Sequence, residues 1–333
     1  MKTGHFVILG CVGLVFGVVG GLAISGMLPP LPFSWGTAQT PSPELQSTPK
    51  DLPEDDAAYA AFDQGKYLTA LKLAEEAATR NDPQAHTLIG RIYADGLGVS
   101  RDESVAARWY ARGAELGDVQ GMLALGTMLA EGRGVGKDMG LAAEMFEKAA
   151  VTGDPLANYN LGLMFLRGNG KPENPHRAAQ HIQYAAERGI AAAQYDLAVL
   201  YIDGRGVPHD GLEAARWSAR AAEQGLPAAE YDYAVMLLQG RGLKADEEKA
   251  IKYLSSAAEK GVAGAQNRLS HVYAEGAGID ASAVQAAKWR LIAKASGVED
   301  ERLDQFVAAL SEDERTEAEK AAEDWQTRKQ IMP

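Results

Sequence analysis

A 36-residue repeat runs through most of the chain and constrains its fold more than any other feature of the sequence. A Gly-x-Gly pair recurs every 36 residues, and a single glycine and an alanine recur with the same spacing. The pairs begin at 96, 132, 168, 204, 240 and 276, the single glycines stand at 117, 153, 189, 225, 261 and 297, and the alanines stand at 106, 142, 178, 214, 250 and 286. A period between about 20 and 50 residues indicates an array of stacked units rather than a closed globular fold.

Each repeat has the pattern of a helical hairpin. In the repeat at 193–228, apolar residues at helical spacing predict a first helix, which Gly204 and Gly206 end because glycine takes positive φ without a clash of Cβ. A second helix is predicted from 211 to about 224. The residue before this second helix is in every repeat one that can cap a helix N-terminus, namely Asp102, Asp138, Asn174, Asp210, Asp246 or Ser282. The sequence therefore predicts an all-α fold.

Four further segments flank the six repeats, which we place at 85–300. Residues 54–84 have the pattern of a divergent hairpin that caps the array, and 301–333 contain two more helical stretches that close its other end. Residues 29–53 hold seven of the 14 prolines, which favours an extended linker. The remaining segment, 1–28, precedes this linker.

The segment 1–28 has the properties of a membrane anchor. Residues 6–28 are apolar and uncharged, and at about 1.5 Å per residue they span the ~30 Å hydrocarbon core of a bilayer. Lys2 precedes them and mainly acidic residues follow, so the charge bias places the amino terminus in the cytoplasm and the repeats beyond the membrane. A signal peptide cleaved before Gly26 is the alternative, and it leaves the repeats on the same side.

Three glycines at a spacing of four, Gly13, Gly17 and Gly21, lie on one face of the predicted anchor helix. Such a pattern lets a second membrane helix approach closely, so these residues are candidates for a helix–helix contact within the membrane. The general abundance of glycine in membrane helices is the alternative explanation.

Composition and motifs argue against catalysis and against nucleic-acid binding. The single Cys excludes a disulfide scaffold, and the six His residues do not have the spacing of a metal site. The sequence contains no nucleophile elbow and no phosphate-binding loop. A net charge of −12 disfavours a nucleic-acid partner. We therefore expect no enzyme activity, no cofactor, no metal and no small-molecule substrate.

The repeats resemble the Sel-one-like repeat (SLR) family, which is related to the tetratricopeptide repeat. The resemblance covers about 85–300 and rests on Leu-Gly at 125–126 and 161–162, Gly-x-Gly-Val at 96–99, 132–135 and 204–207, and Trp-Tyr at 109–110. Lys171-Pro172 depart from the loop pattern, and Ala198, Ala234 and Ser270 replace a helical glycine. The resemblance implies a right-handed α/α superhelical solenoid that acts as an adaptor or scaffold, with bacterial relatives in the cell envelope and no common catalytic residues.

Tetratricopeptide geometry implies that positions three, four and seven of the first helix of each repeat line a concave face. In the middle repeats these positions combine aromatic, amide or carboxyl, and aliphatic side chains, which suit the capture of a protein segment. The candidate groove residues are Tyr159, Tyr195, Tyr231, Asn160, Asp196, Asp232, Leu163, Val199 and Val235. The first two repeats carry Thr87, Leu88, Arg91, Leu123, Ala124 and Thr127 at the same positions. The alternative is that the tyrosines belong to the repeat consensus and only pack.

These observations predict a non-catalytic scaffold that is tethered to the bacterial inner membrane by a single pass, with its repeats in the periplasm, and that binds protein partners. One alternative is a soluble periplasmic regulator released by signal cleavage. Another is an accessory subunit of a membrane complex that docks through its transmembrane helix. A binder of cell-wall polysaccharide also stays open.

Overall fold

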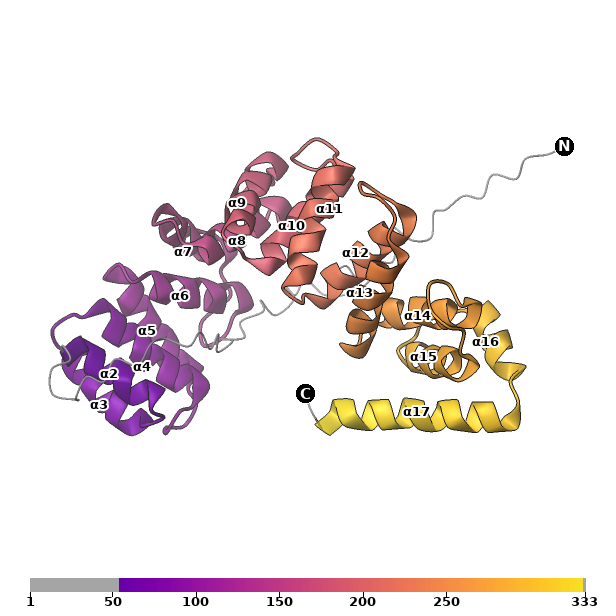
Figure 1. Cartoon of the computed structure of the whole chain (residues 1–333). Helices are drawn as coiled ribbons and strands as arrows, with labels where there is room; N and C mark the ends of the chain where they lie inside the picture. Colours follow the sequence, from indigo (N-terminus) through magenta and orange to yellow (C-terminus); the bar gives the residue numbers. More distant parts are fainter. Residues whose placement is uncertain (1–53, 332–333) are drawn as a thin grey trace, which may run out of the picture. The chain divides into compact units, whose positions relative to one another are not determined.

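The computed structural model describes residues 54–331, which form sixteen helices and, within that range, no strand (Figure 1). This confirms the predicted all-α repeat fold. The predicted anchor at 1–28, with Gly13, Gly17 and Gly21, and the linker at 29–53 lie outside the described residues. Among the helices that are described, none has the length and apolar character needed to cross a membrane.

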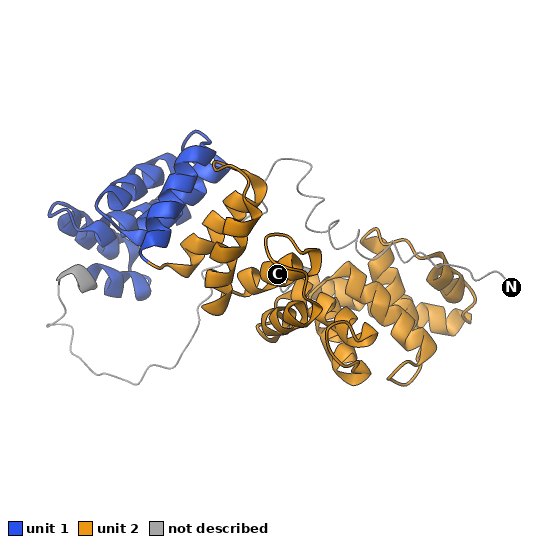
Figure 2. Cartoon of the chain, turned by 90° about the horizontal axis from the view of Figure 1, so that it is seen from above, with its two compact units in different colours: residues 1–152 blue, residues 153–333 orange. Residues whose placement is uncertain are grey.

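The chain divides into two compact units, residues 1–152 and 153–333 (Figure 2). Each unit consists of helical hairpins, whose first helices we call A helices and whose second helices we call B helices. The described part of unit 1 contains the A helices α2 (Glu54–Asp63), α4 (Pro83–Asp95) and α6 (Val119–Glu131) and the B helices α3 (Tyr67–Ala78), α5 (Glu103–Glu115) and α7 (Met139–Val151).

Unit 2 contains four hairpins and two closing helices. Its A helices are α8 (Pro155–Arg167), α10 (Ala191–Asp203), α12 (Pro227–Gln239) and α14 (Ala263–Glu275). Its B helices are α9 (Pro175–Glu187), α11 (Gly211–Glu223), α13 (Glu247–Glu259) and α15 (Ala283–Ala295), and α16 (Glu301–Ala308) and α17 (Glu312–Ile331) follow. Each B helix also packs against the next A helix of its unit, so the hairpins stack in chain order.

The helix ends follow the sequence pattern. The A helices of the six repeats end on the first residue of the Gly-x-Gly pair in the left-handed conformation, for example Gly96 with φ 68° and Gly204 with φ 64°. The predicted N-caps of the B helices are confirmed, because each capping side chain accepts a backbone N–H from the first turn of its helix. The repeat therefore encodes both ends of its helices locally.

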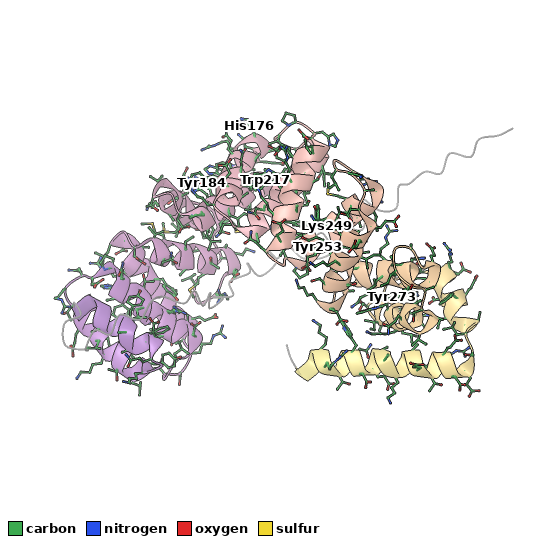
Figure 3. The ribbon with its side chains drawn as sticks, viewed as in Figure 1. His176, Tyr184, Trp217, Lys249, Tyr253 and Tyr273 are labelled. Atoms are coloured by element: carbon green, nitrogen blue, oxygen red, sulfur yellow. The ribbon has the colours of Figure 1, made fainter. Side chains whose placement is uncertain are left out.

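Close packing within a hairpin depends on small residues that face large ones. A Cβ at Gly90 would lie 2.8 Å from the ring of Tyr110, and one at Gly126 would lie 2.8 Å from the ring of Phe146. The six repeated alanines of the B helices have no exposed surface. The Trp residues that follow them on the same helices at 217 and 289 are buried, as expected for core residues, and Trp217 is labelled in Figure 3.

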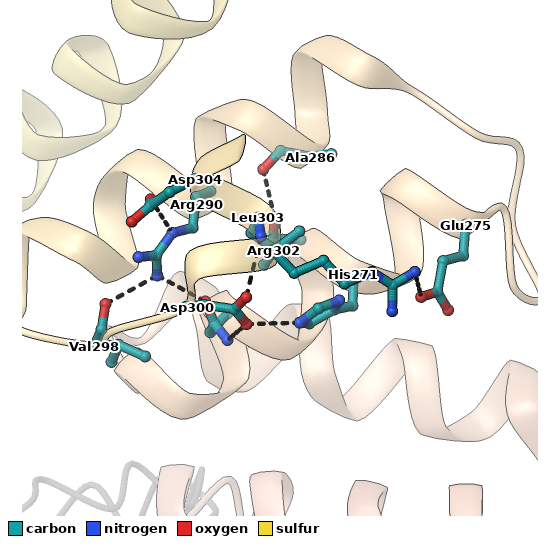
Figure 4. A network of polar contacts seen from close by, with 11 residues as sticks. His271, Glu275, Ala286, Arg290, Val298, Asp300, Arg302, Leu303 and Asp304 are labelled. Atoms are coloured by element: carbon teal, nitrogen blue, oxygen red, sulfur yellow. Dashed lines mark hydrogen bonds and ion pairs between the residues drawn. The ribbon is translucent and has the colours of Figure 1, made fainter. Parts of the chain in front are cut away.

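A polar network closes the carboxyl-terminal end of the array (Figure 4). The guanidinium of Arg290, only 1% exposed, donates from Nε to Asp304 Oδ1 at 2.7 Å and from Nη1 to Asn267 Oδ1 at 2.9 Å. Asp300 contacts Asn267 Nδ2 and His271 Nε2 and also caps α16. Desolvation acts against ionisation, but these hydrogen bonds outweigh it and lower the pKa of Asp300 to about 2. The network therefore joins α14, α15 and α16.

The long helix α17 covers the end of the last hairpin. Its Trp325 ring packs edge-on against Trp289 at 5.9 Å, and the indole Nε1 donates to Glu259 at 2.8 Å. At the start of the helix, Ser311 and Glu314 exchange hydrogen bonds as a capping box. The apolar flank of α15 is thereby covered by a mainly polar helix.

Candidate interaction surface

Two of the predicted groove tyrosines in unit 2 connect neighbouring A helices. The hydroxyl of Tyr159 on α8 donates to Asp196 Oδ2 on α10 at 2.9 Å, and Tyr195 on α10 donates to Asp232 Oδ2 on α12 at 2.8 Å. The two tyrosines are only 7% and 8% exposed. A tyrosine at position three therefore reaches the carboxylate at position four of the next A helix.

The third tyrosine, Tyr231 on α12, is half-buried and also turns toward the following helix. A Cβ at Gly264 on α14 would lie 3.1 Å from its ring. Position four of α14 is Arg268 rather than an aspartate. The side chains of the three tyrosines consequently pack against the following A helix. Their placement favours the packing alternative, and a direct role in binding stays a prediction.

The other predicted groove residues of unit 2 differ in exposure. Leu163 and Asn160 are buried, whereas Val199, Val235 and the two aspartates are half-buried. Burial is the larger influence on the carboxyl groups of Asp196 and Asp232 and raises the pKa of each to about 6, although the tyrosine hydrogen bond acts in the opposite direction. Near neutral pH, this face of unit 2 is therefore acidic and crossed by hydrogen bonds.

The corresponding face of unit 1 is hollow. A cavity of about 420 Å³ lies against the A helices α2, α4 and α6 and is also lined by α5 and two loop residues. Its residues are Tyr59, Thr87, Leu88, Arg91, Ala94, Asp95, Arg101, Tyr110, Gln120, Ala124, Thr127, Met128 and Arg133. We call this cavity the unit 1 hollow. Its volume falls in the range of about 300–1,000 Å³ that is typical of ligand sites.

Two arginines of the unit 1 hollow converge on one glutamate. Arg101 Nη2 lies 2.5 Å and Arg133 Nη1 lies 3.4 Å from Glu103 Oε1, and Arg133 also pairs through Nε with Glu131. The hydrogen bond from Arg101 is the largest influence on Glu103 and lowers its pKa, so the pairing persists well below neutral pH. Because both glutamates are outside the cavity lining, they orient the arginines without filling the hollow.

The third arginine of the hollow, Arg91, is held from two sides. Its guanidinium lies 4.6 Å from the centre of the Phe62 ring and its Nε lies 3.8 Å from Asp95 Oδ2. The hydroxyl of Tyr59 donates to Gln84 O at 3.3 Å, and burial raises the pKa of Tyr59 to about 12. The hollow thus offers neutral hydroxyls and cations in fixed positions above an apolar floor.

None of the candidate groove residues named from the sequence lines this hollow. The expected concave-face positions of the first two repeats include five residues that line it, namely Thr87, Leu88, Arg91, Ala124 and Thr127. Eight of the thirteen lining residues lie outside these positions, among them Tyr59, Tyr110, Arg101 and Arg133. Arg133 is the middle residue of a Gly-x-Gly pair, so its position in the repeat was visible, but its pairing with Glu103 depends on how the loop folds back.

The described part of the chain contains no group of three or more His, Cys, Asp or Glu residues placed to hold a metal ion. His181 stacks on Phe165 at 5.7 Å and contacts Asn158 Oδ1 at 3.0 Å, so its ring takes part in packing.

Comparison with known proteins identifies the repeat. The Sel1 repeat family model matches residues 83–118, 119–150, 155–190, 191–226, 227–262 and 263–297. The chain belongs to the Sel1 repeat family. The resemblance inferred from the sequence is thereby confirmed. No curated protein matches the chain.

Two solved structures of Sel1 repeat proteins show the same fold. A Sel1 repeat protein from Oxalobacter formigenes is 27% identical, with a TM-score of 0.66 over 75% of this chain and 100% of the other. A protective antigen of uropathogenic Escherichia coli strains is 25% identical, with a TM-score of 0.54 over 84% of this chain and 72% of the other. Sel1 repeat proteins generally act as protein–protein interaction scaffolds and are typically non-catalytic.

Proposed function

We propose that this Sel1 repeat protein is a membrane-tethered periplasmic scaffold that holds a protein partner against the A helices. The observation that carries the proposal is the unit 1 hollow, whose polar side chains are held in place by Glu103, Glu131 and Asp95. Fixed side chains lose little conformational freedom when a partner binds. A partner segment that enters the hollow also covers the half-buried apolar residues of its lining, Ala94 and Ala124.

Site-specific photocrosslinking in intact cells tests the binding surface. A photoreactive residue in place of Ala124, which lines the hollow, should capture a protein partner. The matched control replaces Arg108, an exposed residue on the B helix α5 of the same unit. Equal capture from both positions, or capture from Arg108 alone, would contradict the proposed surface.

The tether and the compartment are proposed from the sequence alone. The apolar segment 6–28 and the acidic residues that follow it support a single pass with the repeats in the periplasm. The mass of the purified chain distinguishes an intact anchor from signal cleavage, and protease treatment of spheroplasts should degrade the repeats if they lie outside the inner membrane. Protection of the repeats from the protease would overturn the compartment.

Docking of the anchor helix to a membrane complex is the remaining alternative from the sequence. Replacement of Gly13, Gly17 and Gly21 by Leu would block close helix approach while keeping the segment apolar. If the crosslink from position 124 survives these replacements, partner binding belongs to the repeats. Its loss would instead assign binding to the membrane helix.

A further inference from the structure

We infer that the unit 1 hollow selects an acidic peptide segment, one that carries carboxylate side chains next to aliphatic ones. This inference rests on the proposed function and adds the chemistry of the partner. Three arginines and one carboxylate residue, Asp95, line the cavity. In a chain with a net charge of −12, such a lining is not a consequence of overall composition.

The arginines still have donors for a ligand. A guanidinium carries five N–H groups. The ion pairs of Arg101 engage only Nη2, and those of Arg133 engage Nε and Nη1. Their side chains are 62% and 43% exposed, so the remaining N–H groups can reach a ligand in the hollow. Arginine and carboxylate match in geometry because both are planar and pair through two parallel hydrogen bonds.

The same surroundings disfavour more highly charged ligands. Glu103, Glu131 and Asp95 lie within 4 Å of the arginines, so a phosphate group or a nucleic-acid backbone would meet repulsion together with attraction. A carboxylate carries a single negative charge and therefore needs fewer cationic partners than a phosphate group does. The apolar part of the lining, which includes the half-buried Ala94 and Ala124, then favours an aliphatic neighbour in the ligand.

A loop contact fixes the position of Arg133. A Cβ at Gly134 would lie 2.1 Å from the carbonyl oxygen of Glu103, so the Gly-x-Gly loop rests directly on the start of α5. Arg205 has the same place in a unit 2 loop and pairs with Glu173 at 2.7 Å. Arg205 therefore has the loop-bracing contact of Arg133 but is not part of the hollow, and it provides a matched control.

Isothermal titration calorimetry of the full chain in detergent micelles tests the inference. The probes are the capped peptides acetyl-(Glu-Leu)4-amide and acetyl-(Gln-Leu)4-amide. The glutamate peptide should bind at least about tenfold more tightly, because its carboxylates form charge-assisted hydrogen bonds with the arginines and the amides of the glutamine peptide do not. Arg133→Gln should weaken its binding about tenfold, whereas Arg205→Gln should change it less than about twofold.

The contrary outcomes are distinct. Equal affinity for the two peptides, absence of binding at millimolar peptide, or equal losses for Arg133→Gln and Arg205→Gln would each overturn acid selection. Binding that is seen only after deletion of residues 29–53 would assign the hollow to the chain's own linker and overturn an external partner. If acid selection fails while photocrosslinking at position 124 succeeds, the scaffold function stands without it. Failure of both removes both proposals.

Discussion

The two units are built from the same helical hairpins, but the faces formed by their A helices differ in shape and in charge. In unit 1 the face is hollow and lined by arginines, whereas in unit 2 tyrosine–aspartate hydrogen bonds connect successive A helices. The difference comes from positions three and four of the A helix. Leu123 and Ala124 occupy them in α6, and Tyr195 and Asp196 occupy them in α10. The tyrosine and the aspartate that form the bridges in unit 2 are therefore absent from α6.

The largest expected effect tests whether the contact between the Gly-x-Gly loop and the preceding B helix stabilises both units equally. Gly134 in unit 1 and Gly242 in unit 2 have φ 67° and 69°, and an added Cβ would lie 2.1 and 1.9 Å from a backbone carbonyl oxygen. Replacement of either by Ala should reduce the free energy of unfolding by about 2–4 kcal/mol, because left-handed strain and steric overlap add. Urea unfolding of the full chain, with hydrogen exchange to locate the affected unit, measures the loss.

Matched controls for these glycines have positive φ but open surroundings. Gly117 and Gly261 both have φ 97°, and nothing lies within 4 Å of an added Cβ. Their Ala variants should lose only about 1–2 kcal/mol, the cost of the left-handed conformation. Equal losses at all four positions would show that the loop contact contributes nothing to the free energy of unfolding.

The next effect is a pH dependence confined to unit 2. The pKa values of Asp196 and Asp232 are about 6 in the folded chain, above their ordinary value of 3.8. Between these values the folded state holds more protons than the unfolded state, so the stability of unit 2 falls as pH rises from about 4 to about 6. The loss between pH 4.5 and pH 7 should be on the order of 2 kcal/mol for each aspartate.

Urea unfolding at pH 4.5 and pH 7 measures this dependence. The double variant Asp196→Asn, Asp232→Asn should flatten it, since amides do not titrate in this range. Unit 1 carries Leu88 and Ala124 at the corresponding positions and should not share the effect. An unchanged slope in the double variant would mean that other groups cause it.

The smallest of the three effects concerns a single hydroxyl. Tyr195→Phe removes the donor to Asp232 and leaves a half-buried carboxylate with one fewer partner, so unit 2 should lose about 1.5 kcal/mol at pH 7. Tyr59→Phe in unit 1 is the control, because its hydroxyl donates only at 3.3 Å in an exposed contact. Its loss should stay below about 0.5 kcal/mol. Equal losses would remove the distinction between a bridged and an open face.

Much of the fold was predictable because its signals are local. Gly204 ends α10 and Asp210 caps α11 through interactions between residues a few positions apart, and these contacts form in any chain with that pattern. The candidate site was less predictable. The sequence left open whether the tyrosines line a groove or pack, because it does not show that position three points toward the next A helix, where a half-buried aspartate accepts the hydroxyl of Tyr159 or Tyr195.

The sequence by itself determined the period, the helix ends, the capping pattern and the membership of the Sel1 repeat family, because these depend on short-range geometry repeated in register. Only the tertiary structure decided which residues of each repeat are exposed to solvent and which pack against a neighbouring helix. Arg101 and Arg133 belong to different loops, and they meet at Glu103 only when successive hairpins stack. The unit 1 hollow exists for the same reason, since its lining combines residues of three A helices, α2, α4 and α6.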